Sequence, residues 1–251
     1  MHILVAIPII VNPIVAKEAI DQVINKSNVT VLLCNNGGDH AIDELLLKYS
    51  DMKNVVLWKK EKNVYVNPIW NEFIRHFLES DEYDRLIIMN SDLTLQKDWD
   101  KVVINRWNVN YNEIIVPHLT DDKRAMYLSM DPTYGSSYKT YSNTPGIFIT
   151  LNKEQAREVY PIPEECKIWF GDTWIFAILV EGGQGIVTPA NLIAYHHHST
   201  SVQKVPGIHE IIELDKIQWA QFIHSELSDK ITKSKINKLK NGFSSSTLPS
   251  E

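Results

Sequence analysis

Short apolar runs alternate with helix-period segments over the first 115 residues, and this alternation constrains the fold more than any other feature. The runs Ile3–Ile7, Val29–Cys34, Val55–Trp58 and Arg85–Asn90 are of strand length. The last run is too continuously apolar to be half-exposed, as expected for a strand in the middle of a covered sheet. The pattern predicts an α/β fold with an open, mostly parallel, Rossmann-like sheet and helices on both of its faces.

Helix-start signals lie between these strands. Asn12-Pro13 and Asn67-Pro68 both combine a capping residue with a proline suited to a first helical turn. The cleanest amphipathic helix follows the second signal, and its apolar positions are Ile69, Trp70, Phe73, Ile74, Phe77 and Leu78. Further strands are predicted near Glu113–Pro117 and Gly146–Thr150.

The expected domain boundaries lie where the alternation of strands and helices stops. We expect one α/β domain over residues 1–205, with a first half to about residue 117 and a second half from 118 to 205. A C-terminal helical extension is expected over 206–240, and the serine-rich residues 241–251 are expected to be disordered. The polar, tyrosine-bearing segment His118–Pro145 breaks the alternation, which is typical of a mobile lid or an acceptor-binding platform.

Composition limits the cellular locations and the binding partners that are expected for the chain. The net charge of −6 argues against a protein that coats nucleic acid by bulk electrostatics. Two cysteines, Cys34 and Cys166, are too few for a disulfide framework, so a reducing, cytoplasmic location is expected. The apolar N-terminus is short and is broken by Pro8, and no segment reaches 18 apolar residues, so no transmembrane segment is expected.

Candidate site residues follow three of the predicted strands. They are Pro8, the turn from Asn35 to Asp39, and Asn90-Ser91-Asp92. In open α/β sheets, ligands bind beyond the carboxyl ends of the strands, where these groups would meet. The spacing of two would point Asn90 and Asp92 at one site and turn Ser91 away. The alternative is a strand-end turn in which Asp92 caps the next helix.

Four ordered motifs carry a resemblance to a known family. They are ILVAIPII, CNNGGD, NVYVNPIWN with Asn63 and Asn71 eight positions apart, and NSD within LIIMNSDLTLQKDW. From the first strand to the histidine run, the chain resembles the family-two glycosyltransferases of the GT-A fold, especially their rhamnosyltransferase-like branch. It departs from the family where Asn35 and Asn90 replace aspartates and Tyr65 replaces a glycine.

The resemblance implies an inverting glycosyltransferase that moves a hexosyl or pentosyl group from a nucleotide diphosphate-sugar to an acceptor hydroxyl. A divalent metal (Mn or Mg), held by Asp92, would neutralise the diphosphate. The implied donor-binding residues are Pro8, Asn35, Asp39, Asn63, Asn71, Asn90 and Ser91.

By the same resemblance, Asp172 in IWFGDTWIFAILVEGGQGI takes the place of the general base. Inverting displacement needs a carboxylate within reach of the acceptor hydroxyl. A helix N-terminus would hold Asp172 ionised. The alternative is that Asp172 only caps the helix over 173–180, while Trp169, Trp174 and Phe176 are core, although one tryptophan could line the acceptor site.

Three consecutive histidines stand in AYHHHSTS. On a strand His196 and His198 would share a face, and the family's late metal ligand falls near this point. The spacing to Ser201 favours His196. The alternative is a solvated strand end.

Downstream, Glu210–Ile223 is predicted to be one amphipathic helix, and Lys230–Lys240 is rich in lysine. Such a run is typical of a solvated helix face. Otherwise it would contact a phosphate-rich acceptor such as DNA, or an anionic lipid surface.

Two rival functions remain beside the transferase. A nucleotidyltransferase would need a glycine-rich, basic loop after the first strand, where this chain has IPIIVNP. A non-catalytic, carbohydrate-binding module is kept open by Asn35 and Asn90. A Rossmann dehydrogenase is disfavoured because no G-x-G-x-x-G motif follows a strand. The sequence leaves the acceptor open between a glycan, a protein and modified DNA carrying a hydroxymethylated base.

Overall fold

The computed structural model describes residues 1–121, 123, 136–139, 146–197 and 205–244; the side chains of 136–139, 222 and 237–244 are not described. The strands are β1 Ile3–Ile9, β2 Val29–Asn36, β3 Val55–Lys60, β4 Arg85–Met89, β5 Leu93–Leu95, β6 Ile114–Ile115, β7 His118–Thr120, β8 Ser136–Lys139, β9 Phe148–Asn152, β10 Ile186–Pro189 and β11 Ile193–His196. The helices are α1 Pro13–Val23, α2 His40–Leu47, α3 Val66–Glu79, α4 Trp99–Val109, α5 Lys153–Val159, α6 Gly171–Glu181, α8 Ile208–Gln218, the π-helical turn η3 Trp219–Ile223 and α9 His224–Ser244.

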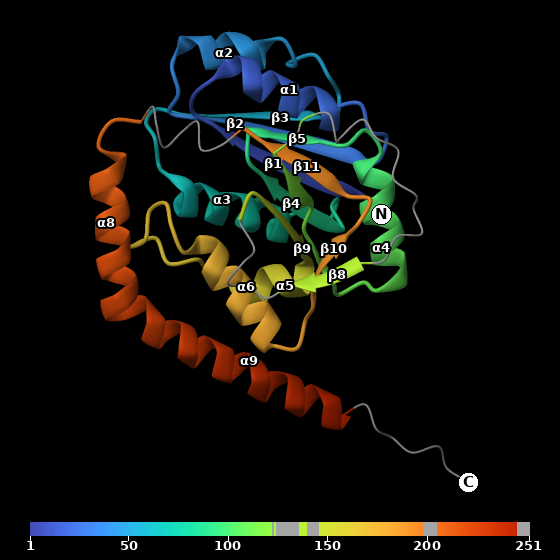
Figure 1. Cartoon of the computed structure of the whole chain (residues 1–251), viewed down its shortest axis with the longest axis vertical. Helices are drawn as coiled ribbons and strands as arrows, with labels where there is room; N and C mark the ends of the chain where they lie inside the picture. Colours follow the sequence, from blue (N-terminus) through green and yellow to red (C-terminus); the bar gives the residue numbers. More distant parts are fainter. Residues whose placement is uncertain (122, 124–135, 140–145, 198–204, 245–251) are drawn as a thin grey trace.

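The central sheet has five strands in the order β3-β2-β1-β4-β9 (Figure 1). The first four are parallel to one another, and β9 runs antiparallel to β4. The predicted open, mostly parallel α/β sheet is therefore confirmed. Because β1, β2 and β4 run parallel, their carboxyl ends lie at the same edge of the sheet.

Helices cover both faces, as predicted, with α1 and α2 on one side and α3, α5 and α6 on the other (Figure 1). The alternation of side chains along β1 explains the two layers, since Leu4 and Ala6 join the α3 side while Ile3, Val5 and Ile7 join the α1 side. Each large apolar side chain buried in this way contributes about 1.5–3 kcal/mol to stability.

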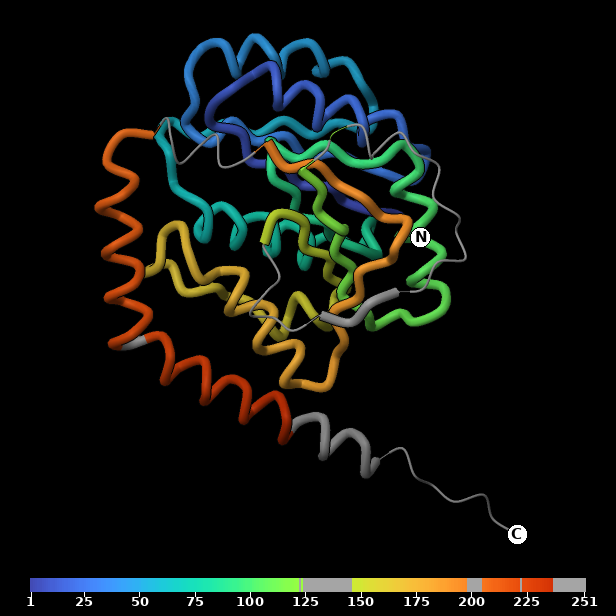
Figure 2. The backbone as a smooth tube through the Cα atoms, in the orientation of Figure 1, coloured from blue at the N-terminus to red at the C-terminus, as the bar shows by residue number. Residues whose placement is uncertain are grey.

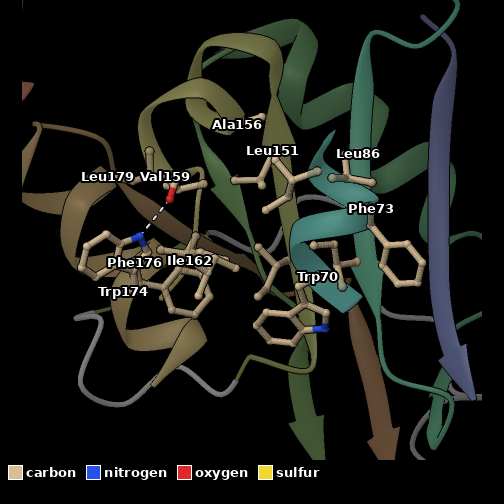
Figure 3. Packing of buried hydrophobic residues seen from close by; sticks show 14 of the residues in the cluster. Trp70, Phe73, Leu86, Leu151, Ala156, Val159, Ile162, Trp174, Phe176 and Leu179 are labelled. Atoms are coloured by element: carbon tan, nitrogen blue, oxygen red, sulfur yellow. Dashed lines mark hydrogen bonds between the residues drawn. The ribbon is translucent and has the colours of Figure 1, made fainter. Parts of the chain in front are cut away.

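The layer on the α3 side is aromatic and continues from α3 into α5 and α6. Figure 3 shows Trp70 and Phe73 on one side of it and Trp174 and Phe176 on the other. The indole Nε1 of Trp174 donates to the carbonyl oxygen of Val159 at 2.8 Å. This bond satisfies the polar atom of a ring that is otherwise surrounded by apolar groups.

A small three-stranded sheet, β5-β11-β7, lies beside the central one. β5 follows directly after the residues that end β4, and β11 pairs with it antiparallel, with His196 opposite Leu93. The small sheet thereby brings the histidine run to the end of β4. The remaining strands form the order β6-β10-β8.

One of the two predicted helix starts is confirmed in position. Asn12 occupies the N-cap position of α1 and Pro13 begins the helix, although Asn12 has a positive φ of 59° and makes no capping bond through its side chain. α3 begins one residue before Asn67, whose amide nitrogen instead donates to the carbonyl oxygens of Cys166 and Trp169. Asn67 therefore ties α3 to a distant loop and does not cap the helix.

The C-terminal arm runs continuously from α8 through η3 into α9 along the edge of the molecule (Figure 2). The helix predicted to end at Ile223 continues to Ser244, so residues 241–244 are helical and the rest of the predicted tail lies outside the described residues. Ile223 and Leu227 join the core.

The lysine run predicted as a solvated face is partly engaged with the body. Lys235 pairs with Glu181 at 2.8 Å, and Lys230 donates to the carbonyl oxygens of Val159 and Tyr160. Burial lowers the pKa of Lys230 to about 8. Across the described chain, no helix combines the length and apolar character that crossing a membrane requires.

Candidate active site

A cavity of about 500 Å³ opens at the carboxyl ends of the parallel strands. Its walls come from the ends of β1, β2 and β4, the start of α3, the junction before α6, β11 and the start of the C-terminal arm. The lining residues are Pro8, Ile9, Ile10, Asn36, Asn63, Tyr65, Val66, Ile69, Trp70, Asn90, Ser91, Asp92, Gly146, Ile147, Ile168, Trp169, Phe170, Asp172, Thr173, His196, Val205 and Ile208.

Strand parity decides which asparagine of β2 reaches the cavity. Asn36 lines it, whereas Asn35 turns to the other face and uses its amide to bond Asp43 at 2.7 Å and the backbone N–H of Gly38 at 2.6 Å. Asn36 has the parity of Cys34, which packs on the α3 side with Ala6. Asn36, and not Asn35, is therefore the asparagine of β2 that lines the cavity, and the period-two rule applied to this strand would have indicated it.

Asn36 also organises the loop that carries Asn63 and Tyr65. Its amide nitrogen donates to the Asn63 side chain at 3.3 Å and to the Tyr65 carbonyl at 3.2 Å. Tyr65 occupies the position of a glycine in the resembled family. Its backbone, with φ 67° and ψ −169°, has a conformation that residues other than glycine rarely adopt. Close packing against Asn63 also explains Gly37, where an added Cβ would lie 2.1 Å from the backbone nitrogen of that residue.

The residues after β4 all line the cavity. Asn90, Ser91 and Asp92 do so together, because β4 ends at Met89 and the three residues form a turn in which strand alternation no longer applies. Ser91, which was expected to turn away, thus contributes to the cavity lining as well. No helix follows Asp92, since β5 begins at the next residue, so the helix-capping alternative is wrong.

Asp92 and His196 meet inside the cavity. The imidazole Nε2 lies 3.2 Å from the carboxylate Oδ1, and Asp92 is 6% exposed. Pairing of β11 with β5 holds the two together, helped by a bond from the backbone N–H of His197 to the carbonyl oxygen of Asp92.

The neighbouring histidines differ from His196. The His197 ring turns to Thr94, with Nε2 at 2.9 Å from Oγ1, and burial lowers its pKa. His198, predicted to share the face of His196, lies outside the described residues. Most of the predicted lid, His118–Pro145, lies outside them too.

The Asp92–His196 pair fits a divalent cation in part. A carboxylate oxygen and an imidazole nitrogen are suitable donors for a Mn-like ion. Within the described residues, no group of three or more histidine, cysteine, aspartate or glutamate side chains could enclose one. An ion held here would therefore need further oxygen ligands, such as the phosphates of a substrate.

Asp172 lines the cavity from the first turn of α6. Its Oδ2 accepts the backbone N–H of Gly146 at 3.0 Å, and Oδ1 accepts that of Thr173 at 2.8 Å. Phe170, not Asp172, occupies the N-cap position, so the simple capping alternative does not describe it.

The electrostatic state of Asp172 differs from the expectation. Burial raises its pKa, and the two backbone N–H bonds oppose that rise only in part. The N–H groups at the start of α6 lower the pKa of this carboxyl, as expected, but the effect of burial is larger and the net shift is upward. A carboxyl with a raised pKa is suited to exchanging a proton with a substrate.

Besides Asn35, two further residues predicted to bind a donor lie outside the cavity lining. Asp39 caps α2, accepting the backbone N–H of Ala41 at 3.1 Å. Asn71 bridges α3 to the loop before α6, because its side chain both accepts from the N–H of Ile162 and donates to the Ile162 carbonyl, each at 2.8 Å. Both side chains hold the fold around the site.

Several lining residues were missed or left open by the sequence. Trp174 and Phe176 are core, as the alternative had it, but Trp169 is 44% exposed and lines the cavity. Tyr65 and Trp70 also line the cavity, but neither was predicted as a site residue. Ile208 could not have been foreseen, because only tertiary packing brings the C-terminal arm to the cavity.

Comparisons with known proteins place this fold. No model of a protein family and no curated protein sequence matches the chain. Among solved structures, it is similar to S. aureus TarS 1–349, with a TM-score of 0.59 and 14% identity over 99% of this chain and 76% of that one.

It is also similar to GalNAc-T7 with UDP, GalNAc and Mn2+, with a TM-score of 0.61 and 10% identity over 88% of this chain and 49% of that one. TarS 1–349 in complex with UDP-GlcNAc gives a TM-score of 0.58 and 10% identity over 99% and 77%. These neighbours are GT-A-type glycosyltransferases, and the chain has the same fold.

Proposed function

We propose that this chain is a glycosyltransferase that uses a nucleotide diphosphate-sugar and a divalent metal, and inverts the anomeric centre. The observation that carries the proposal is one cavity, at the carboxyl ends of the strands, shared by the Asp92–His196 pair and the partly buried Asp172. The GT-A fold supports it, because the structural neighbours include GalNAc-T7 with UDP, GalNAc and Mn2+ and TarS 1–349 in complex with UDP-GlcNAc.

The donor would bind where the parallel strands end. Pro8, Asn36 and Asn63 lie at the ends of β1 and β2 and in the adjoining loop, where a nucleoside would be held. Asn90, Ser91 and Asp92 lie beside them at the end of β4. The diphosphate would lie at Asp92, where a bound Mn2+ or Mg2+ would neutralise the charge that develops on the leaving group.

Asp172 is proposed as the general base. The acceptor oxygen attacks the anomeric carbon, its proton passes to the Asp172 carboxylate, and the bond from that carbon to the phosphate oxygen breaks with its electron pair leaving on the diphosphate. Direct displacement inverts the configuration. The bonds from Gly146 and Thr173 fix the carboxylate while it does this.

The test is a screen of UDP-, GDP-, CDP- and dTDP-sugars with Mn2+ and with chelator, scoring release of the nucleoside diphosphate. We expect metal-dependent release with one donor class, and an NMR spectrum of the product with the anomeric configuration opposite to that of the donor. Retention of configuration would contradict inversion. No release from any donor would favour the non-catalytic carbohydrate-binding module.

A further inference from the structure

Five of the residues that line the cavity form an apolar set from two elements. Ile168, Trp169 and Phe170 come from the loop before α6, and Val205 and Ile208 come from the start of the C-terminal arm. Trp169 is 44% exposed, although large aromatic side chains of a core are normally covered. These five residues are called the apolar set below.

The loop that contributes to the apolar set is fixed by one carboxylate of the C-terminal arm. Asp215 on α8 is 1% exposed and accepts three consecutive backbone N–H groups, from Lys167 and Ile168 at 2.7 Å each and from Trp169 at 2.9 Å. Hydrogen bonds to an ionised acceptor are about twice as strong as neutral ones. Asp215 therefore holds the loop from 46 or more residues away in the sequence.

Two further contacts restrain the same loop. The Phe170 ring stacks on Trp219 of η3, with the centroids 4.7 Å apart and the planes 10° apart. On the other side, the Asn67 amide donates to the carbonyl oxygen of Trp169 at 3.0 Å. Phe170 keeps a left-handed backbone of φ 66°, which persists only where the surroundings enforce it.

We propose that the apolar set forms the acceptor subsite, that it takes a neutral sugar ring lying on Trp169, and that Asp215 positions it. The inference rests on the proposed function and names the acceptor class. A sugar ring presents a face of C–H groups that packs on an aromatic ring. Trp169 stands three residues before Asp172, so a sugar on it would have a hydroxyl near the base.

The charges around the cavity argue against a polyanionic acceptor such as DNA. No lysine or arginine is among the described residues that line the cavity. Lys216 lies 5.5 Å from the centroid of the Trp169 ring, but it is paired with Glu213 at 2.6 Å. A nucleic acid acceptor would require several cations along its phosphates.

The test is saturation-transfer NMR on the full chain with methyl β-glucoside and methyl N-acetyl-β-glucosaminide as neutral probes. Methyl β-glucuronide and an oligonucleotide carrying hydroxymethylcytosine are the anionic probes. We expect a neutral sugar to bind, with an affinity about tenfold or more lower in Trp169→Ala and largely restored in Trp169→Phe. Asp215→Asn should weaken sugar binding, while Glu213→Gln on the exposed side of the same helix should not.

The outcomes separate clearly. Binding of an anionic probe in place of the neutral sugars would overturn the inference, as would no binding of either neutral sugar or binding that Trp169→Ala leaves unchanged. Affinity for nucleoside diphosphates, measured on the same variants, should stay within about twofold of the wild type, and this also shows that each variant is folded. If a sugar binds through Trp169 but no donor is turned over, the proposed transferase function is contradicted, while the sugar-binding site at Trp169 is supported.

Discussion

Asp92 and His196 lie 104 positions apart in the sequence, and their side chains approach to 3.2 Å because β11 pairs antiparallel with β5 directly after the turn that carries Asp92. A pair placed in this way stays fixed relative to the strand ends. The same strand pairing gives the two neighbouring histidines different surroundings, since His196 lines the cavity while His197 turns to Thr94.

His196→Ala should raise the Mn2+ concentration needed for half-maximal activity by about 10–100-fold, with partial rescue by excess metal. The matched control is His197→Ala, which removes the bond to Thr94 and should lower thermal stability while leaving the metal requirement unchanged. Metal titrations of both variants distinguish them. Equal metal requirements in the two variants would remove His196 from the metal site.

Asp172→Asn should lower turnover by about 10²–10⁴-fold, because the amide cannot take the proton of the acceptor hydroxyl. Donor affinity should stay close to that of the wild type. The measurement is kcat beside a separate binding titration with nucleoside diphosphate. Wild-type turnover in this variant would show that Asp172 is not the base.

The pH dependence of kcat/KM should reflect the raised pKa of Asp172. The base must be ionised, so kcat/KM should fall as pH drops through a pKa that lies above the ordinary range of aspartate because of burial. The contribution of Asp172 to the free energy of unfolding has the opposite pH dependence. Because burial disfavours the ionised form, this contribution is lost as pH rises through the same pKa. An acid limb that is unchanged in any residual activity of Asp172→Asn would assign it to another group.

Gly146→Ala should lower kcat without weakening donor binding. An added Cβ would lie 2.4 Å from the Asp172 Cβ, so the carboxylate must move, and a displacement of about 1 Å can reduce the rate by 10²-fold. Gly183→Ala is the control, because it has open space around it and only a backbone of φ 89° to strain. Equal kcat in both variants would show that the position of Asp172 does not matter.

Asn71→Ala should destabilise the fold and spare the donor site. Each buried polar group left without a partner costs about 1–3 kcal/mol, and the backbone N–H of Ile162 would lose its acceptor. Asn63→Ala, inside the cavity, should instead weaken nucleotide binding. Thermal unfolding and nucleotide titration of the two variants test this contrast, and a reversed pattern would return Asn71 to the donor site.

The fold could be predicted from the sequence because its periodicities are local. The continuous apolar run of β4 and the helical stripe of α3 each specify their own structure, and short connections leave few ways to join them. Helix starts were less predictable. Asn67 has the residue type of a cap, but it lies within the first turn and is bonded to a loop about 100 residues further on.

The site was predictable only where a local pattern determines direction. The alternation of side chains along β2, which can be read from the sequence, indicates that Asn36 and not Asn35 lines the cavity. At Ser91 the chain forms a turn, so strand alternation no longer predicts which residues face the cavity. The role of Asp215 depends on packing between α8 and a distant loop, and nothing in its neighbourhood along the chain indicates it. The raised pKa of Asp172 likewise comes from burial, which tertiary structure decides.

The most direct test of the account is calorimetric titration of UDP, GDP, CDP and dTDP into the full chain, with Mn2+ and with chelator, for the wild type and Asp92→Asn. We expect one nucleotide to bind the wild type in a metal-dependent way, and Asp92→Asn to lose about 100-fold or more of that affinity. Asp98→Asn, at an exposed carboxylate paired with Lys101, should bind like the wild type. Equal binding with metal and chelator, or full affinity in Asp92→Asn, would contradict a metal-assisted nucleotide-sugar site.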